Sequence, residues 1–156
     1  MSGGNLHTIA ERIRSELIDL ERVVYRIAMS WERAVQEDDE FCLDSVAFNL
    51  YGFSAGLERI FIQIGEVIDG DLPGGEDSHL SLLNQMTRDN PPVRPPVVSA
   101  SVGERLEVYG DFRQLVYDAH AYRFYAPQME PLVMSAPDLF AQLKAELSAF
   151  AASLEG

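Results

Sequence analysis

The chain has 156 residues, of which 47% are hydrophobic, and it carries a formal net charge of −13 at pH 7. This length can bury one sizeable core, so we expect a single domain over residues 1–156. Proteins that grip a phosphate backbone usually rely on clustered Lys and Arg, so the charge argues against non-specific nucleic-acid binding and we expect no DNA partner. All basic residues except Lys144 are arginines, whose rigid fork still suits a small anion site.

The composition excludes other classes of protein. No apolar run approaches the roughly 20 residues of a membrane span, and residues 1–4 lack the features of a secretory signal, so we expect a cytoplasmic protein without a membrane partner. The single Cys42 excludes an internal disulfide and favours a small buried side chain over a reactive thiol. With 3 His and 1 Cys, and no repeated Glu-x-x-His, we expect no metal and no cofactor.

The amino-terminal part of the chain is typical of two long amphipathic helices, over about residues 6–36 and 40–68. So short an acidic link between them predicts antiparallel packing. Gly52 and Gly56 each cost about 1 kcal/mol relative to Ala, unless a neighbouring helix approaches closely. The apolar seams are Ile13, Leu17, Leu20, Val24, Ile27 and Trp31 in the first helix, and Leu43, Val46, Leu50, Phe53, Leu57, Ile60, Ile64 and Val67 in the second.

A short third helix follows the helix-breaking residues 69–75. Ser78 is expected to cap it, and it should run from Leu80 to Arg88 with Leu82, Leu83 and Met86 facing inward. His79 lies at its start, where the helix dipole opposes protonation, which favours a structural, hydrogen-bonded role over a functional one. The proline-rich residues 90–96 predict an extended connector that holds Arg94 out, and we list Arg94 as a binding residue.

The fourth helix should run from near Ser101 to just before Pro127, and a last helix should be capped by Ser135 with Pro137 in its first turn. Two apolar arcs on the fourth helix predict burial on more than one side, and hence a dimer. The core stripe is Val108, Phe112, Leu115, Ala119 and Tyr122, and the second arc is Leu106, Tyr109, Val116, Tyr117 and Phe124. The chain as a whole predicts an all-α, antiparallel up-and-down bundle of four main helices plus a short one.

The fourth helix carries the residues best suited to chemistry. At about 100° per residue, Arg113 and His120 fall about 20° apart on one side, whereas Asp118 and Gln114 fall on the opposite arc. Such a pair suits cleavage of RNA without a metal, because a histidine can exchange a proton near neutral pH and an arginine can stabilise the charge on phosphoryl oxygens. A structural pairing of a buried His with a partly buried Arg accounts for the same residues equally well.

The layout of these motifs resembles the HEPN superfamily, in particular the HepT-like ribonuclease toxins. Besides the two long helices, the resemblance rests on the segments Leu82-Leu-Asn-Gln-Met86, Arg94-Pro-Pro-Val97, Phe112-Arg113 and His120-Ala-Tyr122. It implies a helical bundle that dimerises and cleaves RNA without a metal, with Arg113 and His120 as the catalytic pair. It also implies a nucleotidyltransferase antitoxin that can attach nucleotide to Tyr122. We expect Tyr117 and Tyr122, together with Arg94, to be binding residues.

Two alignments of the motif are open. The tighter alignment, with the shorter spacing after Arg113, places Asp118 where the family has its catalytic histidine. Only the looser alignment, with the longer spacing, places His120 at that position. The alternative function is therefore a catalytically degenerate HEPN bundle that acts as a binding or scaffold module. A helical interaction protein unrelated to HEPN is a third hypothesis.

Overall fold

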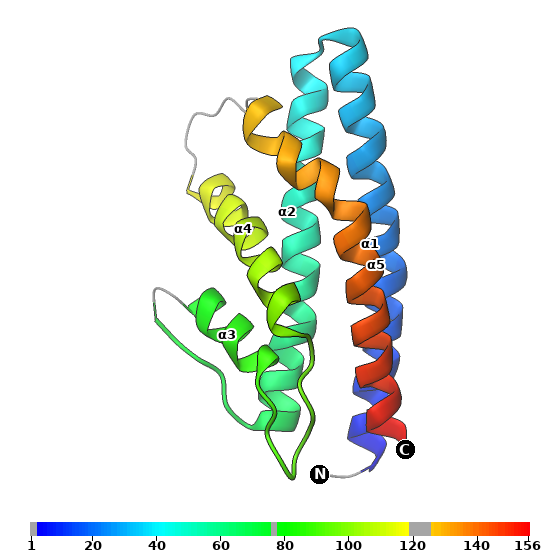
Figure 1. Cartoon of the computed structure of the whole chain (residues 1–156), viewed down its shortest axis with the longest axis vertical. Helices are drawn as coiled ribbons and strands as arrows, with labels where there is room; N and C mark the ends of the chain where they lie inside the picture. Colours follow the sequence, from blue (N-terminus) through cyan, green and yellow to red (C-terminus); the bar gives the residue numbers. More distant parts are fainter. Residues whose placement is uncertain (1–2, 76–77, 119–125) are drawn as a thin grey trace.

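The computed structural model describes residues 3–75, 78–118 and 126–156. The helices of these ranges are α1 (Gly3–Glu37), α2 (Glu40–Gln63), α3 (Ser78–Thr87), α4 (Ala100–Tyr117) and α5 (Ala126–Glu155) (Figure 1). A π-helix, η1 (Ile64–Asp69), continues α2 directly and ends at Gly70, whose φ is 71°. The expected all-α bundle of four main helices and a short one is confirmed. No helix in the described ranges has the length and apolar character needed to cross a membrane.

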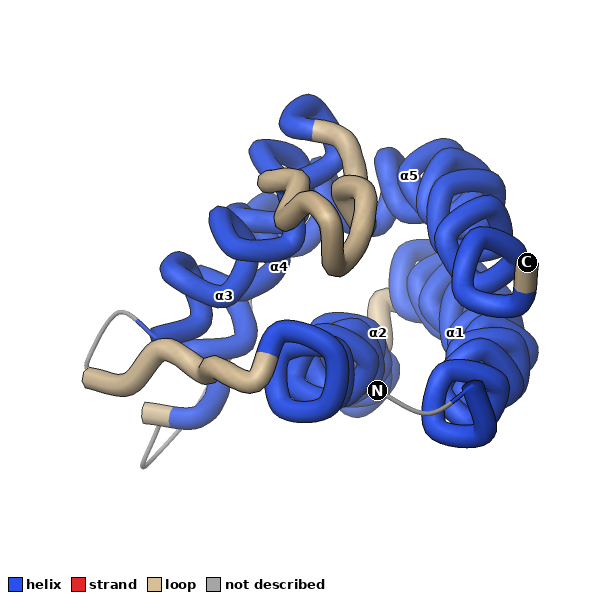
Figure 2. The backbone as a smooth tube through the Cα atoms, turned by 90° about the horizontal axis from the view of Figure 1, so that it is seen from below, coloured by secondary structure: helices blue, strands red, loops and turns tan. Residues whose placement is uncertain are grey.

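The long helices α1 and α2 form an antiparallel hairpin, as their short link predicts (Figure 1). The carboxylate of Asp39 caps α2 by accepting a hydrogen bond of 2.9 Å from the N–H of Phe41, and Glu40 adds negative charge at that end of the helix. Helix α5 packs along α1, while α4 packs on α2, and α3 packs against both α4 and α2 (Figure 2). Helices α2, α3 and α4 thus meet on one side of the bundle.

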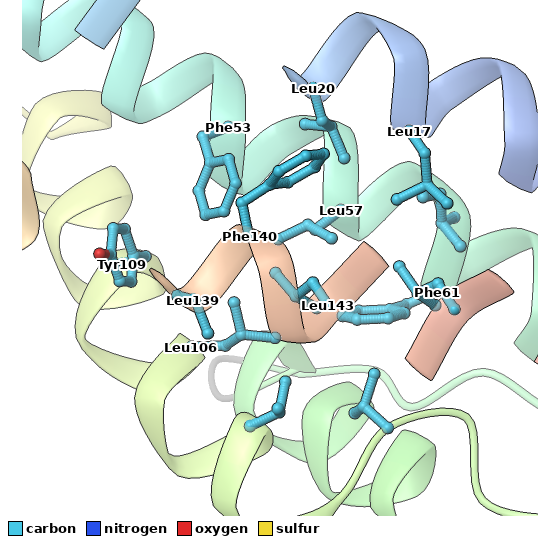
Figure 3. Packing of buried hydrophobic residues seen from close by; sticks show 14 of the residues in the cluster. Leu17, Leu20, Phe53, Leu57, Phe61, Leu106, Tyr109, Leu139, Phe140 and Leu143 are labelled. Carbon is cyan, nitrogen blue, oxygen red and sulfur yellow. The ribbon is translucent and has the colours of Figure 1, made fainter. Parts of the chain in front are cut away.

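The predicted seams of α1 and α2 and the predicted inward side chains of α3 form one continuous core with apolar side chains of α5. All six predicted positions of α1 are buried, and so are those of α2 except Leu43 and Val67, which are partly buried. In Figure 3 the rings of Phe53 and Tyr109 lie close together, with centroids 5.4 Å apart and planes at 60°, an edge-to-face arrangement. The Tyr109 hydroxyl donates a hydrogen bond of 2.7 Å to the carbonyl of Leu132, so α4 is fixed against α5.

The predicted core stripe of α4 is wrong. Val108 and Leu115 are 52% and 45% exposed, whereas Leu106 and Tyr109, assigned to the second arc, are buried. Two arcs of similar apolar character are present, and packing between α2, α5 and α3 decides which of them faces inward. Of the predicted stripe, Phe112 is buried, while Ala119 and Tyr122 lie outside the described residues, as does Phe124 of the second arc.

Several predicted helix ends also differ. Helix α4 ends at Tyr117 rather than before Pro127, and Ser78 is the first residue of α3. Ser135 does not cap α5, because α5 already begins at Ala126 and contains both Pro131 and Pro137. The turns before Pro137 bury Met129, Leu132 and Val133. This burial outweighs the backbone hydrogen bond that a proline removes from a helix.

The two glycines of α2 have different surroundings. A Cβ on Gly56 would lie 2.8 Å from Cδ2 of Leu20 in α1, so this glycine does permit the expected close approach. A Cβ on Gly52 would meet no atom within 4 Å.

We therefore expect Gly52→Ala to raise the free energy of unfolding by up to about 1 kcal/mol, since alanine favours a helix. Gly56→Ala should lower it, because Leu20 is buried and cannot move aside freely. Urea denaturation of the two variants and the unsubstituted chain measures both effects. An equal gain from both substitutions would contradict the close approach of α1 and α2.

Candidate functional site

A cavity of about 340 Å³ lies where α2, α3 and α4 meet. Its apolar wall combines side chains from all three helices, namely Leu57, Phe61, Leu82, Leu83 and Leu106. Its polar groups also come from all three helices, namely Ser54, Glu58, Ser78, His79, Arg113, Gln114 and Tyr117. The cavity is therefore lined by both apolar and polar side chains, and a concave site with convergent polar groups is where a small molecule or substrate usually binds.

Arg113 projects from α4 into this cavity and is partly buried, with 29% of its side chain exposed. Its Nη1 forms an ion pair with Oε2 of Glu58 on α2, an oxygen that is itself shielded from solvent. The guanidinium also lies over the ring of Tyr51, 5.5 Å from the centroid, within the range of a cation–π interaction. These two contacts from α2 fix the position of the guanidinium at the cavity wall.

His79 reaches the same cavity from the first turn of α3. Its ring lies against α4 at Gly110, where a Cβ would be 3.3 Å from its Cδ2. Its Nε2 lies 3.9 Å from Oδ1 of Asp111, an ion-pair distance that is too long for a hydrogen bond. The imidazole is 28% exposed, so it can be reached from solvent.

Tyr117, a predicted binding residue, lines the cavity as the last residue of α4 and is 73% exposed. Asp118 follows as the C-cap and is exposed, and both of its carboxylate oxygens accept from Nε2 of Gln114 at 3.1 Å. This is the solvent-side position expected for Asp118. His120 and Tyr122 lie outside the described residues, so the predicted pairing of Arg113 with His120 stays a prediction.

The position predicted for Arg94 is wrong, because its side chain is only 1% exposed rather than held out in solvent. Its Nε and Nη2 donate to Asp69 at 2.6 and 2.8 Å, in a bidentate pair. Its remaining N–H groups donate to the backbone carbonyls of Gln85, Arg88 and Pro95. All five donors of the guanidinium are thus used inside the fold, and we assign Arg94 a structural role.

The connector around Arg94 is a compact turn rather than an extended segment. Asn90 and Arg94 exchange backbone hydrogen bonds of 2.9 and 2.8 Å, and the N–H groups of Val97 and Val98 donate to the carbonyl of Met86. Burial by itself raises the pKa of the Asp69 carboxyl, but hydrogen bonds from Arg94 and Gln85 outweigh it and hold that pKa below its usual value. The connector is held in place by this buried charge pair.

One group of possible metal ligands occurs in the described ranges. His7, Glu11 and Glu155 offer atoms within 4.8 Å of one another on the exposed surface. Arg14 forms ion pairs with both carboxylates, and its hydrogen bond to Glu155 is the main cause that lowers the pKa of Glu155. The group is best interpreted as a salt-bridge network that joins the ends of α1 and α5.

The sequence did not assign the residues that surround Arg113. Glu58 lies off the seam of α2, Tyr51 is one of several tyrosines, and His79 was interpreted as structural. The only signal for Glu58 is a carboxylate within the largely apolar second half of α2, and its partner lies 55 positions along the chain, at Arg113.

Cys42 is partly buried rather than buried, and desolvation, with Asp39 nearby, raises the pKa of its thiol.

Together, the bundle and its cavity define an all-α protein whose candidate site is built between helices from an arginine, a histidine and a carboxylate. A family model described as HepT-like protein matches residues 45–154, from Ser45 in α2 to Leu154 in α5. The chain belongs to the HepT-like family of the HEPN superfamily. Comparisons with curated proteins and with solved structures give no significant match.

Proposed function

We propose that this protein is a metal-independent endoribonuclease of the HepT-like toxin type, acting as a homodimer with Arg113 and His120 at its cleft. The observation that carries the proposal is Arg113, a partly buried arginine fixed at a cavity wall within the family-matched region. In this reaction the 2′-hydroxyl of RNA attacks the adjacent phosphate, and Arg113 stabilises the negative charge that develops on the phosphoryl oxygens. His120 transfers a proton.

The charge of the chain limits how RNA can bind. With a net charge of −13, the surface as a whole repels a polyanion, so affinity must come from a few local contacts. Arg113 and the stacking surface of the exposed Tyr117 are such contacts. We therefore propose a short single-stranded segment as substrate, in the cytoplasm, with a nucleotidyltransferase antitoxin as the partner that controls it through Tyr122.

The proposed homodimer is supported by apolar side chains that the described part of the chain leaves exposed. Val108 and Leu115 lie two turns apart on one face of α4, and Phe41 and Phe48 lie two turns apart on α2, where they are 81% and 74% exposed. Exposed apolar groups with this spacing favour a helix-mediated protein contact.

The test compares cleavage of an RNA with cleavage of a matched RNA that carries 2′-O-methyl groups, both with a chelator present. We expect cleavage of the first only, with a 2′,3′-cyclic phosphate and a 5′-hydroxyl as product ends. His120→Ala should abolish it. Equal cleavage of both substrates, or full activity in the variant, contradicts the proposal.

A second candidate function is a degenerate HEPN bundle that acts as a binding or scaffold module. Two observations favour it: Glu58 already engages Arg113, and Asp118 occupies the tighter motif position on the exposed surface. This function predicts a folded protein that cleaves no RNA. Cleavage that is lost in Arg113→Ala excludes it.

A further inference from the structure

The cavity between α2, α3 and α4 places a cationic group beside an apolar wall. Arg113 lines it from α4 and is held there by Glu58 and Tyr51 of α2. The apolar wall is buried and consists of Leu57, Phe61, Leu82, Leu83 and Leu106. A ligand that fits both parts carries an anionic group joined closely to a body that gains by leaving water. A nucleotide is such a ligand, because one sugar joins its phosphate to its base.

The size of the cavity suits a single base. Its volume of about 340 Å³ is at the lower end of the roughly 300–1,000 Å³ found for small-molecule sites. A run of stacked bases needs a longer groove, and a base that is paired in a duplex cannot enter a space between helices. The nucleotide that enters must therefore be unpaired and must leave the stack of its neighbours.

The polar groups of the cavity suit the edge of a base. Ser54 of α2 and Ser78 of α3 each bring a hydroxyl, and Gln114 of α4 brings an amide. Hydroxyl and amide groups both donate and accept, which matches the mixed donors and acceptors on the edge of a nucleobase. An alkyl chain offers these groups no hydrogen bond, so a lipid tail fits the apolar wall but not the polar groups.

The charges around the cavity make contacts to the base important for affinity. Arg113 is already paired with Glu58, and the chain has a net charge of −13, so a phosphate gains less here than at an unpaired arginine on a basic surface. Transfer of a base from water into a partly apolar site does not depend on net charge. The base can thus supply affinity that the phosphate does not.

We propose that this cavity is a nucleobase pocket, which takes the base next to the phosphate that Arg113 binds. The inference rests on the proposed function and adds a substrate class to it: RNA with an unpaired base at the cleavage site, turned out of the strand and into the cavity. The apolar wall holds the body of the base, and Ser54, Ser78 and Gln114 bind its edge.

The experiment measures binding to the full chain by calorimetry. The ligands are the four nucleoside 3′,5′-bisphosphates and the matching abasic tetrahydrofuran bisphosphate, which carries the same phosphates without a base. We expect at least one nucleoside bisphosphate to bind about tenfold or more tightly than the abasic compound, since a base adds many buried atoms to the ligand. Equal binding of all five compounds, or no binding of any nucleoside bisphosphate, overturns the proposal.

A pair of variants places the bound base in this cavity. Ser54→Phe fills the cavity from α2 and should remove the preference for a base. Ser45→Phe, the same substitution at a partly buried serine earlier in α2 and outside the cavity, is the control and should keep it. A folded Ser54→Phe protein that keeps the full preference overturns the proposal. Thermal unfolding shows whether each variant is folded, and if Ser54→Phe is not, the five ligands on the unsubstituted chain still decide.

Binding and cleavage together separate this inference from the proposed function. Cleavage of RNA by the unsubstituted protein, without any preference for a base in the binding experiment, defeats the nucleobase pocket alone. Base-dependent binding that Ser54→Phe removes, in a protein that cleaves no RNA, supports the pocket and defeats the proposed function.

Discussion

Replacing Arg94 with alanine should destabilise the fold by about 3–5 kcal/mol, since it leaves the carboxylate of Asp69 buried without its partner. The two side chains are 1% and 4% exposed, so water cannot replace the lost contacts. The carbonyls of Gln85, Arg88 and Pro95 lose their donors in the same step. Urea denaturation followed by circular dichroism measures the loss.

The matched control is Arg59→Ala, which removes another Arg–carboxylate pair from the protein. Arg59 contacts Glu16 at 2.6 Å but is 66% exposed, and exposed pairs contribute about 0–1 kcal/mol. Arg94→Lys keeps the positive charge but loses the fork, and should lie between Arg94→Ala and the unsubstituted chain. Equal losses in Arg94→Ala and Arg59→Ala would show that the buried pair contributes no more than a surface one.

The same pair makes stability depend on pH in a defined direction. Arg94 lowers the pKa of Asp69 in the folded chain below its ordinary value of 3.8. Its contribution to stability is therefore complete above about pH 4 and is lost as the pH falls through the folded-state pKa. Asp69→Asn should lack this acid-side loss, which denaturation at a series of pH values below 5 would reveal.

Arg113→Ala should lower the rate of RNA cleavage by about a hundredfold to a thousandfold, the usual effect of removing a donor that stabilises a developing oxyanion. Arg113→Lys retains the charge without the planar fork and should recover only part of the rate. Single-turnover cleavage of a short RNA measures the chemical step.

Arg105→Ala is the control for this second prediction. Arg105 lies about two turns before Arg113 on α4. It pairs with Asp138 and Gln142 of α5, outside the cavity. The Arg105→Ala variant should cleave RNA at the normal rate. If Arg113→Ala also retains the normal rate while the unsubstituted protein is active, Arg113 is not the anion-stabilising group and the cleavage site lies elsewhere.

Much of the fold follows from periodicity in the sequence. The seams of α1 and α2 are long and have one apolar face each, so their burial could be predicted from spacing alone. Helix α4 has two such faces, and the sequence does not say which one meets α2 and α5. The prolines led to a wrong start for the last helix, because Pro131 and Pro137 both lie inside α5. Buried apolar side chains on both sides of Pro137 offset the cost of a proline within a helix.

The candidate site was predictable only in part, for a related reason. Arg113 could be named because one helix carries the motif, whereas Glu58 and His79 reach it from α2 and α3 through packing between helices. Arg94 was misassigned because its carboxylate partner lies 25 residues earlier in the chain, at the end of η1. Contacts of this kind depend on the three-dimensional arrangement, which no local spacing specifies.

Asp69 joins three pieces of the chain that are separate in sequence. Its carboxylate accepts from Gln85 in α3 and from Arg94 in the connector, while its own backbone ends η1. Helix α3 has 10 residues, too few to be stable alone in water, so its position depends on such anchors. The cavity wall formed by α3 is thus held by the carboxylate of Asp69, which does not itself line the cavity. A substitution of Asp69 would therefore change the shape of the cavity without removing any residue that lines it.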